Sequence, residues 1–119
     1  KQFMMPKTNT RVQLEKFSRS TRYGLSLIAS EIQLARKKRK LTEMDLAERV
    51  GCSRDTIRAI EAGKPTVAIA FVFEAASILG IDLFGGSDEM TRRTQENRAQ
   101  LTLLPASTRV RKPEFRDDF

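Results

Sequence analysis

An all-α fold is predicted for this 119-residue chain, with four to five short helices packed into one compact domain. Three observations predict it. Apolar residues between 26 and 85 recur at helical spacing. Helix-capping residues and glycine stops alternate along the same stretch. No alternating strand pattern competes, except over 81–84. The length fits one domain with extra segments, which we place as a basic N-terminal arm (1–25), the domain (26–85) and a helical or extended tail (86–119).

The first helix is expected over about 26–40. An apolar stripe marks its inner face, and basic residues crowd its last turn, where the helix dipole favours positive charge. The stripe consists of Leu27, Ile28, Ile32 and Ala35.

The second and third helices follow closely. Thr42 is an N-cap residue with Asp45 three positions later, which resembles a capping box. Gly51 suits a left-handed stop. Ser53 then caps a third helix over 54–62 that ends at Gly63.

The last two helices are expected after Thr66 and Ser87. Thr66 would cap a helix over 67–79, ended by Gly80. Ser87 would cap a polar helix over 87–104, and from Pro105 the chain should be extended.

The charge predicts a polyanionic partner. The chain carries 22 basic and 15 acidic residues, a net charge of +7, and proteins this basic usually bind nucleic acid or another anionic surface. Most of the excess lies in the arm, because residues 1–25 hold six basic residues and one acid. The arm is expected to be disordered when free, to lie along a phosphate backbone or minor groove, or both.

The composition excludes much enzymology. The chain has no His and one Cys, so it lacks the commonest general base and any cysteine metal cluster. No apolar run approaches a membrane span, and nothing suggests secretion. We therefore expect a cytoplasmic protein that is not an enzyme, with no cofactor, metal site, membrane association or small-molecule substrate.

Residues 41–64 carry the strongest functional pattern. Two short helices meet at Gly51, and the small Ala47 allows them to approach closely. Apolar residues from both helices point into one core: Leu46, Val50, Ile57 and Ile60. This is the helix-turn-helix arrangement, whose second helix enters a DNA major groove.

The segment resembles the helix-turn-helix of the Cro/CI-type (XRE) repressor family. The matching residues are Leu41-Thr42, Leu46-Ala47, Gly51, Ser53, Thr56-Ile57, Ile60-Glu61, Gly63-Lys64, Ala76 and Leu79-Gly80-Ile81. The resemblance spans about 27–84 and implies a repressor that binds palindromic double-stranded DNA operators as a homodimer. It also implies that Arg36 pairs with Glu61 as a structural ion pair.

The same resemblance implies the residues that contact DNA. Base contacts would come from Arg54, Asp55, Arg58 and Ala59. Phosphate contacts would come from Thr42, Lys38, Lys40, Ser53, Thr56, Lys64 and Thr66. The family often has Gln after the capping Thr and uses it on phosphate. Here the position is Glu43, a carboxylate that cannot donate that hydrogen bond, so Lys38 or Lys40 would have to replace the contact. Alternatively, Arg54 pairs with Asp55 or Glu61 and contacts no base.

The fourth predicted helix is apolar on two faces. A domain this small cannot bury a helix all round. A dimer contact is therefore expected at Val67, Phe71, Ile78, Leu83 and Phe84. The alternative is that residues of the arm cover this surface: Val12, Leu14, Phe17 and Tyr23.

The tail resembles those of antitoxins in the HipA/HipB-type toxin–antitoxin group. The resemblance rests on Leu-Leu-Pro at 103–105, Arg-Val-Arg-Lys-Pro at 109–113 and the acidic end at 117–119. It implies an antitoxin that represses its own operon and binds a HipA-like kinase toxin. The alternatives are a free-standing regulator or a restriction–modification controller without a toxin, and a binder of RNA or of an acidic protein.

Overall fold

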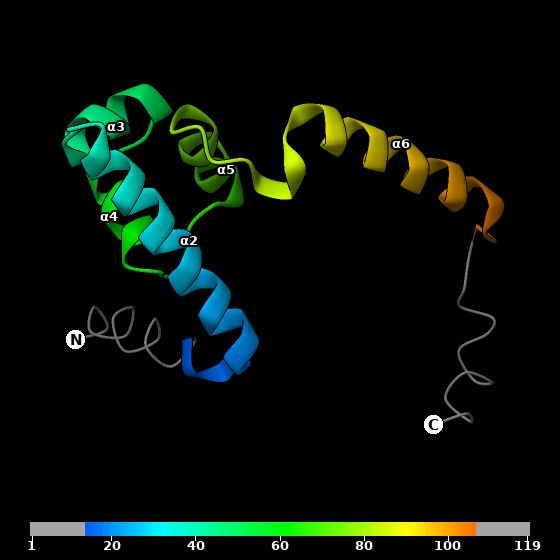
Figure 1. Cartoon of the computed structure of the whole chain (residues 1–119). Coiled ribbons are helices and arrows are strands. Elements are labelled where there is room, and N and C mark those ends of the chain that lie inside the picture. Colours follow the sequence, from blue (N-terminus) through cyan, green and yellow to red (C-terminus); the bar gives the residue numbers. More distant parts are fainter. Residues whose placement is uncertain (1–13, 107–119) are drawn as a thin grey trace. The chain divides into compact units, whose positions relative to one another are not determined.

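The computed structural model describes residues 14–106 (Figure 1). Over this range the elements are α2 (Arg19–Lys38), α3 (Glu43–Val50), α4 (Arg54–Glu61), α5 (Ile69–Ile78), the 3-10 helix η2 (Leu83–Gly85) and α6 (Ser87–Leu103). No strand occurs between 14 and 106, so the all-α prediction is confirmed. The strand considered at 81–84 is absent, since the chain turns there into η2. The chain divides into two units, residues 1–83 and residues 84–119.

The core of the first unit lies between α2, α3, α4 and α5. Ile32 of α2, Leu46 of α3 and Ile57 of α4 are its largest fully buried side chains. Around them pack the remaining buried residues of the cluster: Ala47, Val50, Ile60, Ala75 and Leu79. The four predicted inner residues of α3 and α4 are thus all in the core.

The start and the end of α3 are fixed by local sequence. The Thr42 hydroxyl accepts from the Asp45 amide at 3.0 Å, and the Asp45 carboxylate accepts from the Thr42 amide at 2.9 Å. This closes the predicted capping box. Gly51 ends the helix at φ 88°. This left-handed conformation is unfavourable for residues with a Cβ atom but is readily adopted by glycine. Ser53 caps α4 as predicted, because its hydroxyl accepts from the Thr56 amide.

Helix α2 begins earlier than predicted. It starts at Arg19 rather than 26, because the Ser18 hydroxyl accepts from the Thr21 amide and caps it. The sequence boundary between arm and domain therefore falls inside α2. Leu27, assigned to the core stripe, is 58% exposed. The helix also ends at Lys38, two residues before the predicted end.

Two predicted caps are wrong. Helix α5 begins at Ile69 rather than 67, and no side chain caps it. The chain turns through Pro65–Val67, so Thr66 lies too far ahead of the helix to bond its first amides. In the second unit Ser87 is already helical, Gly86 flanks the helix at φ 92°, and no side chain caps α6.

Helix α6 is a polar helix with no buried residue. Arg92 links two acids on one side of it, Glu89 at 2.6 Å and Glu96 at 3.0 Å. Pairs three and four residues apart stabilise a helix modestly. The other notable feature is a group of exposed leucines at its C-terminal end: Leu101, Leu103 and Leu104.

Candidate nucleic-acid interface

Helices α3 and α4 form the two-helix arrangement predicted for residues 41–64. They are joined by the short turn 51–53. Leu46 of α3 and Ile57 of α4 are both fully buried in the core. The cap at Ser53 and the left-handed Gly51 together set the path of the chain into α4. Helix α4 therefore buries Ile57 and Ile60 and turns its opposite arc to solvent.

The four predicted base-contacting residues lie on or beside that outward arc. Arg54, Asp55 and Arg58 are exposed, and Ala59 is half-buried. The Asp55 carboxylate accepts no hydrogen bond and forms no ion pair with the residues between 14 and 106. The arrangement can present two guanidinium groups and a carboxylate to base edges.

Both arginines bind the same acid, Glu43. One carboxylate oxygen, Oε1, accepts from Nε of Arg58 at 3.1 Å and from Nε of Arg54 at 3.3 Å. The hydrogen bond from Arg58 is the main cause that lowers the pKa of Glu43, so this carboxylate is charged at neutral pH. The pairing expected as the alternative for Arg54, with Asp55 or Glu61, is therefore not what the structure contains.

The role of Glu43 escaped the sequence interpretation. The sequence showed only that an acid replaces a phosphate-binding Gln. No local sequence pattern signals this contact, because Glu43 lies eleven and fifteen residues before the arginines and reaches them only through the way α3 and α4 cross. The residues it meets, Arg54 and Arg58, are one helical turn apart and so share a face.

The predicted phosphate contacts form two groups. Thr42, Ser53 and Thr56 lie at the beginnings of α3 and α4, where the first two hydroxyls cap the helices and the third bonds to Ser53. The others lie outside the helices or near a helix end and are exposed: Lys38, Lys40, Lys64 and Thr66. Unpaired amides at helix starts and exposed lysines are both suited to phosphate.

Arg36 and Glu61 form a bidentate ion pair, as the resemblance implies. Nε donates to Oε2 at 2.7 Å and Nη2 donates to Oε1 at 2.9 Å. The Arg36 Nη1 also donates to the Leu41 carbonyl at 2.9 Å. The hydrogen bonds to Glu61, against the opposing effect of burial, raise the pKa of Arg36. The pair ties α2 to the end of α4 and is not available for DNA.

Three of the residues expected at a dimer interface also serve the core of their own chain. Val67, Phe71 and Ile78 are half-buried and pack against the core cluster. Leu83 is half-buried, whereas Phe84 is 62% exposed. Of the arm residues that the alternative would place over this surface, Phe17 and Tyr23 are exposed, Leu14 is half-buried, and Val12 lies outside the described residues.

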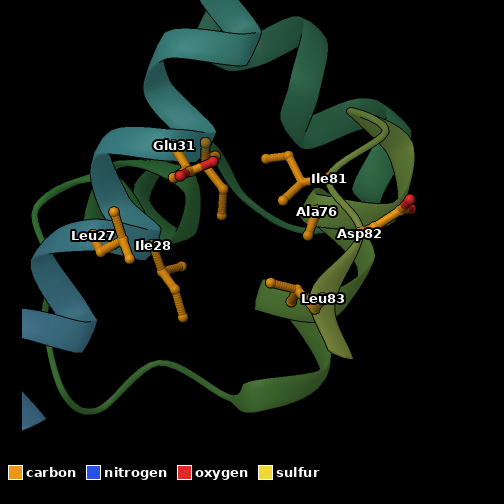
Figure 2. Close-up of a pocket in the computed structure, with 8 residues that line it drawn as sticks. Leu27, Ile28, Glu31, Ala76, Ile81, Asp82 and Leu83 are labelled. Atoms are coloured by element: carbon orange, nitrogen blue, oxygen red, sulfur yellow. The ribbon is translucent and has the colours of Figure 1, made fainter. Parts of the chain in front are cut away.

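An apolar groove opens beside α2. Its volume is about 170 Å³, and Leu27 and Ile28 face Ala76, Ile81 and Leu83 across it (Figure 2). The exposed Leu27 thus lines a groove that is also lined by Leu83, one of the residues expected at the dimer interface.

Neither a metal site nor a membrane-spanning helix is found between 14 and 106. Nowhere in that range do His, Cys, Asp or Glu side chains gather closely enough to hold a metal ion. Cys52 is half-buried, and burial raises the pKa of its thiol, which disfavours the nucleophilic thiolate. Over the same residues no helix is long and apolar enough to cross a membrane.

A family model described as "Helix-turn-helix" matches residues 32–85. No curated protein and no solved structure matched the chain. The matched range begins inside α2 and includes the capping box, the turn at Gly51, the exposed arc of α4 and the whole of α5. Residues 32–85 are therefore a Cro/CI-type helix-turn-helix domain, the kind of domain with which transcription regulators bind DNA.

Proposed function

We propose that the protein is a transcriptional repressor that binds a specific double-stranded DNA sequence. The observation that carries this proposal is the pair of exposed arginines on the outward arc of α4, Arg54 and Arg58. Arginine recognises guanine through paired hydrogen bonds to O6 and N7, which are accessible in the major groove. Asp55 and Ala59 complete the proposed base-contacting set.

The flanks of this helix supply the proposed phosphate contacts. Lys64 and Thr66 follow α4, while Lys38 and Lys40 precede α3. Contacts of this kind fix the register of the protein on DNA without distinguishing sequences. The net charge of +7 supports the same partner.

We further propose that the repressor is a symmetric homodimer on a palindromic operator. A domain with one recognition helix contacts few base pairs, and two such helices one DNA turn apart contact a half-site each. The groove beside Leu83 and the exposed Phe84 support a contact near residues 81–84.

Selection from a pool of random 30-base-pair duplexes tests this function. We expect a palindromic consensus whose half-sites lie about 10 base pairs apart, centre to centre. Enrichment of no sequence, with equal binding of all duplexes, would contradict sequence-specific repression. Preferential binding of RNA in direct competition would instead support the RNA-binding alternative.

The finer role proposed is that of an antitoxin that represses its own operon and binds a HipA-like kinase toxin. Two features support it: the tail resemblance and the exposed leucines at the end of α6. Exposed apolar groups on an otherwise polar helix favour a protein partner. A kinase-like protein encoded beside this gene, and co-purifying with it, would support the antitoxin. A gene without such a neighbour would favour the free-standing regulator.

A further inference from the structure

Glu43 occupies an unusual position for an acid in a DNA-binding surface. It is the first residue of α3, and its side chain is 26% exposed. Its Oε1 atom accepts hydrogen bonds from Nε of both Arg54 and Arg58. A single carboxylate therefore binds both of the arginines proposed to recognise bases.

The geometry leaves a particular part of each arginine free. Glu43 uses only the Nε group, and the terminal Nη atoms of both arginines donate to no residue between 14 and 106. The two Nη groups of a guanidinium can together donate to guanine O6 and N7. Glu43 thus binds the Nε group of each arginine and leaves the two Nη groups available for a base.

The charge of Glu43 acts differently on bases and on phosphates. A carboxylate beside two guanidinium groups neutralises part of their charge and repels phosphate oxygens. A duplex without guanines at the matching positions gains less from these arginines, because the Glu43 carboxylate repels a phosphate that approaches their free Nη groups. A duplex with both guanines can bind the Nη groups without breaking either ion pair.

A purely structural role explains little of this arrangement. Both arginine side chains are about half exposed, at 49% and 55%, and exposed ion pairs contribute little to folding stability. The link between α3 and α4 is already provided by the buried Leu46 and Ile57.

We propose that Glu43 is a specificity-determining residue, which positions Arg54 and Arg58 for guanine recognition and opposes their use on phosphate. The inference rests on the proposed function, since it assigns a task within the same DNA-binding surface. Glu43 is a positioning residue in this account, because it acts through the arginines and contacts no base itself.

The test compares Glu43→Gln with the wild-type protein on two probes. One probe is the duplex that wild type selects most tightly from the random pool, and the other is a scrambled duplex of the same composition. Glu48→Gln is the matched control, because Glu48 lies on α3, is exposed and forms no ion pair with a described residue. Circular dichroism checks that the variants fold.

Glu43→Gln should bind the scrambled duplex at least about threefold more tightly, with a salt dependence steeper by about one unit for each protomer bound. Its ratio of selected to scrambled affinity should fall at least about tenfold, which corresponds to two arginines losing about threefold each in discrimination. Glu43→Asp keeps the charge and should give an intermediate ratio, whereas Glu48→Gln should keep the wild-type ratio within about twofold.

Two outcomes separate this inference from the proposed function. Suppose that wild type selects a consensus but Glu43→Gln has the same ratio of selected to scrambled affinity as the control Glu48→Gln. The inference is then wrong and the repressor proposal stands. If wild type selects no consensus, the proposed function fails and the assignment of Glu43 fails with it.

Discussion

The guanidinium of Arg36 and the carboxylate of Glu61 join α2 to α4 through two parallel hydrogen bonds of 2.7 and 2.9 Å. Both side chains are nearly inaccessible, with 8% and 4% of their surface exposed. Buried charges of this kind depend on each other, since neither has water to replace a lost partner. The ion pair therefore fixes the orientation of α4 relative to the rest of the domain.

Removing one member of this pair should destabilise the domain strongly. We expect Arg36→Met or Glu61→Leu to lower the free energy of unfolding by about 3–5 kcal/mol, because each leaves a buried charge unpaired. The double variant Arg36→Met/Glu61→Leu should recover much of the loss. Urea unfolding of all four proteins measures the coupling. Costs that simply add would show that the two groups do not interact.

Acid should weaken the cap of α3. The hydrogen bond that the Thr42 amide donates to the Asp45 carboxylate is the main cause that lowers the pKa of Asp45. Because the folded-state pKa lies below the ordinary value of about 3.9, the stabilisation is complete above that value. It is lost as the pH falls through the folded-state pKa.

The variant Asp45→Asn tests this linkage. It should be less stable than wild type at pH 7 and should lose less stability between about pH 5 and pH 2. Asp45→Glu keeps a carboxylate in the favoured capping-box form and should retain the acid dependence. Thermal unfolding across this pH range measures both. Parallel pH profiles for wild type and Asp45→Asn would exclude a contribution from this carboxylate.

The sequence predictions at Thr42, Gly51 and Ser53 succeeded because neighbouring residues alone determine the structure there. The caps at Thr42 and Ser53 and the stop at Gly51 are each set within four residues, so their residue types suffice. The predicted start of α2 was wrong because polar residues 18–24 carry no apolar stripe. Their helix depends on the Ser18 cap, whose hydroxyl accepts from the Thr21 amide.

The candidate site divides in the same way. The helical period that turns Ile57 and Ile60 into the core leaves Arg58 on the opposite arc of α4, with Arg54 at the edge of that arc. The partner of these arginines was not predicted, because Glu43 lies eleven and fifteen residues earlier in the chain. Their contact depends on how α3 and α4 cross, which no local pattern encodes.

Arg54 and Lys64 should affect DNA binding in different ways. Arg54→Ala should cost about 1–3 kcal/mol on the selected duplex and relax the preference at one base pair in each half-site. Lys64→Ala should weaken all duplexes alike and reduce the salt slope by about one unit per protomer. Fluorescence anisotropy at several salt concentrations distinguishes the two. Equal losses on selected and scrambled duplexes for Arg54→Ala would show that it contacts phosphate only.

The proposed dimer should depend on the groove beside α2. Leu27→Glu should raise the dimer dissociation constant at least about tenfold, since burying a leucine contributes roughly 1.5–3 kcal/mol. Its monomer should stay folded, because Leu27 is already 58% exposed. Leu34→Glu is the matched control, being 57% exposed on the same helix but outside the groove.

Sedimentation equilibrium measures these dissociation constants. A Leu27→Glu dimer as tight as wild type would move the interface away from the groove. A monomeric wild-type protein at micromolar concentration, with and without the selected duplex, would contradict the dimer itself. Phe71→Asp is a poorer probe, since Phe71 packs against the core of its own chain and its change would also unfold the monomer.

Truncation after Leu104 separates the two proposed activities. Every residue proposed to contact DNA lies before residue 67, so deletion of 105–119 should leave affinity for the selected duplex within about twofold, apart from the few basic residues it removes. Binding of the proposed kinase-like partner should weaken, because ordering a segment on a partner requires apolar anchors to offset about 1–2 kcal/mol per residue fixed. Leu101, Leu103 and Leu104 remain exposed on α6 and should retain part of that binding. Replacing all three leucines by serine in the truncated chain should then abolish it.

Calorimetry with the purified partner and anisotropy with the duplex measure both activities on the same samples. Loss of duplex binding on truncation, with partner binding intact, would contradict this assignment. The tail would then contribute to DNA binding or to the dimer interface.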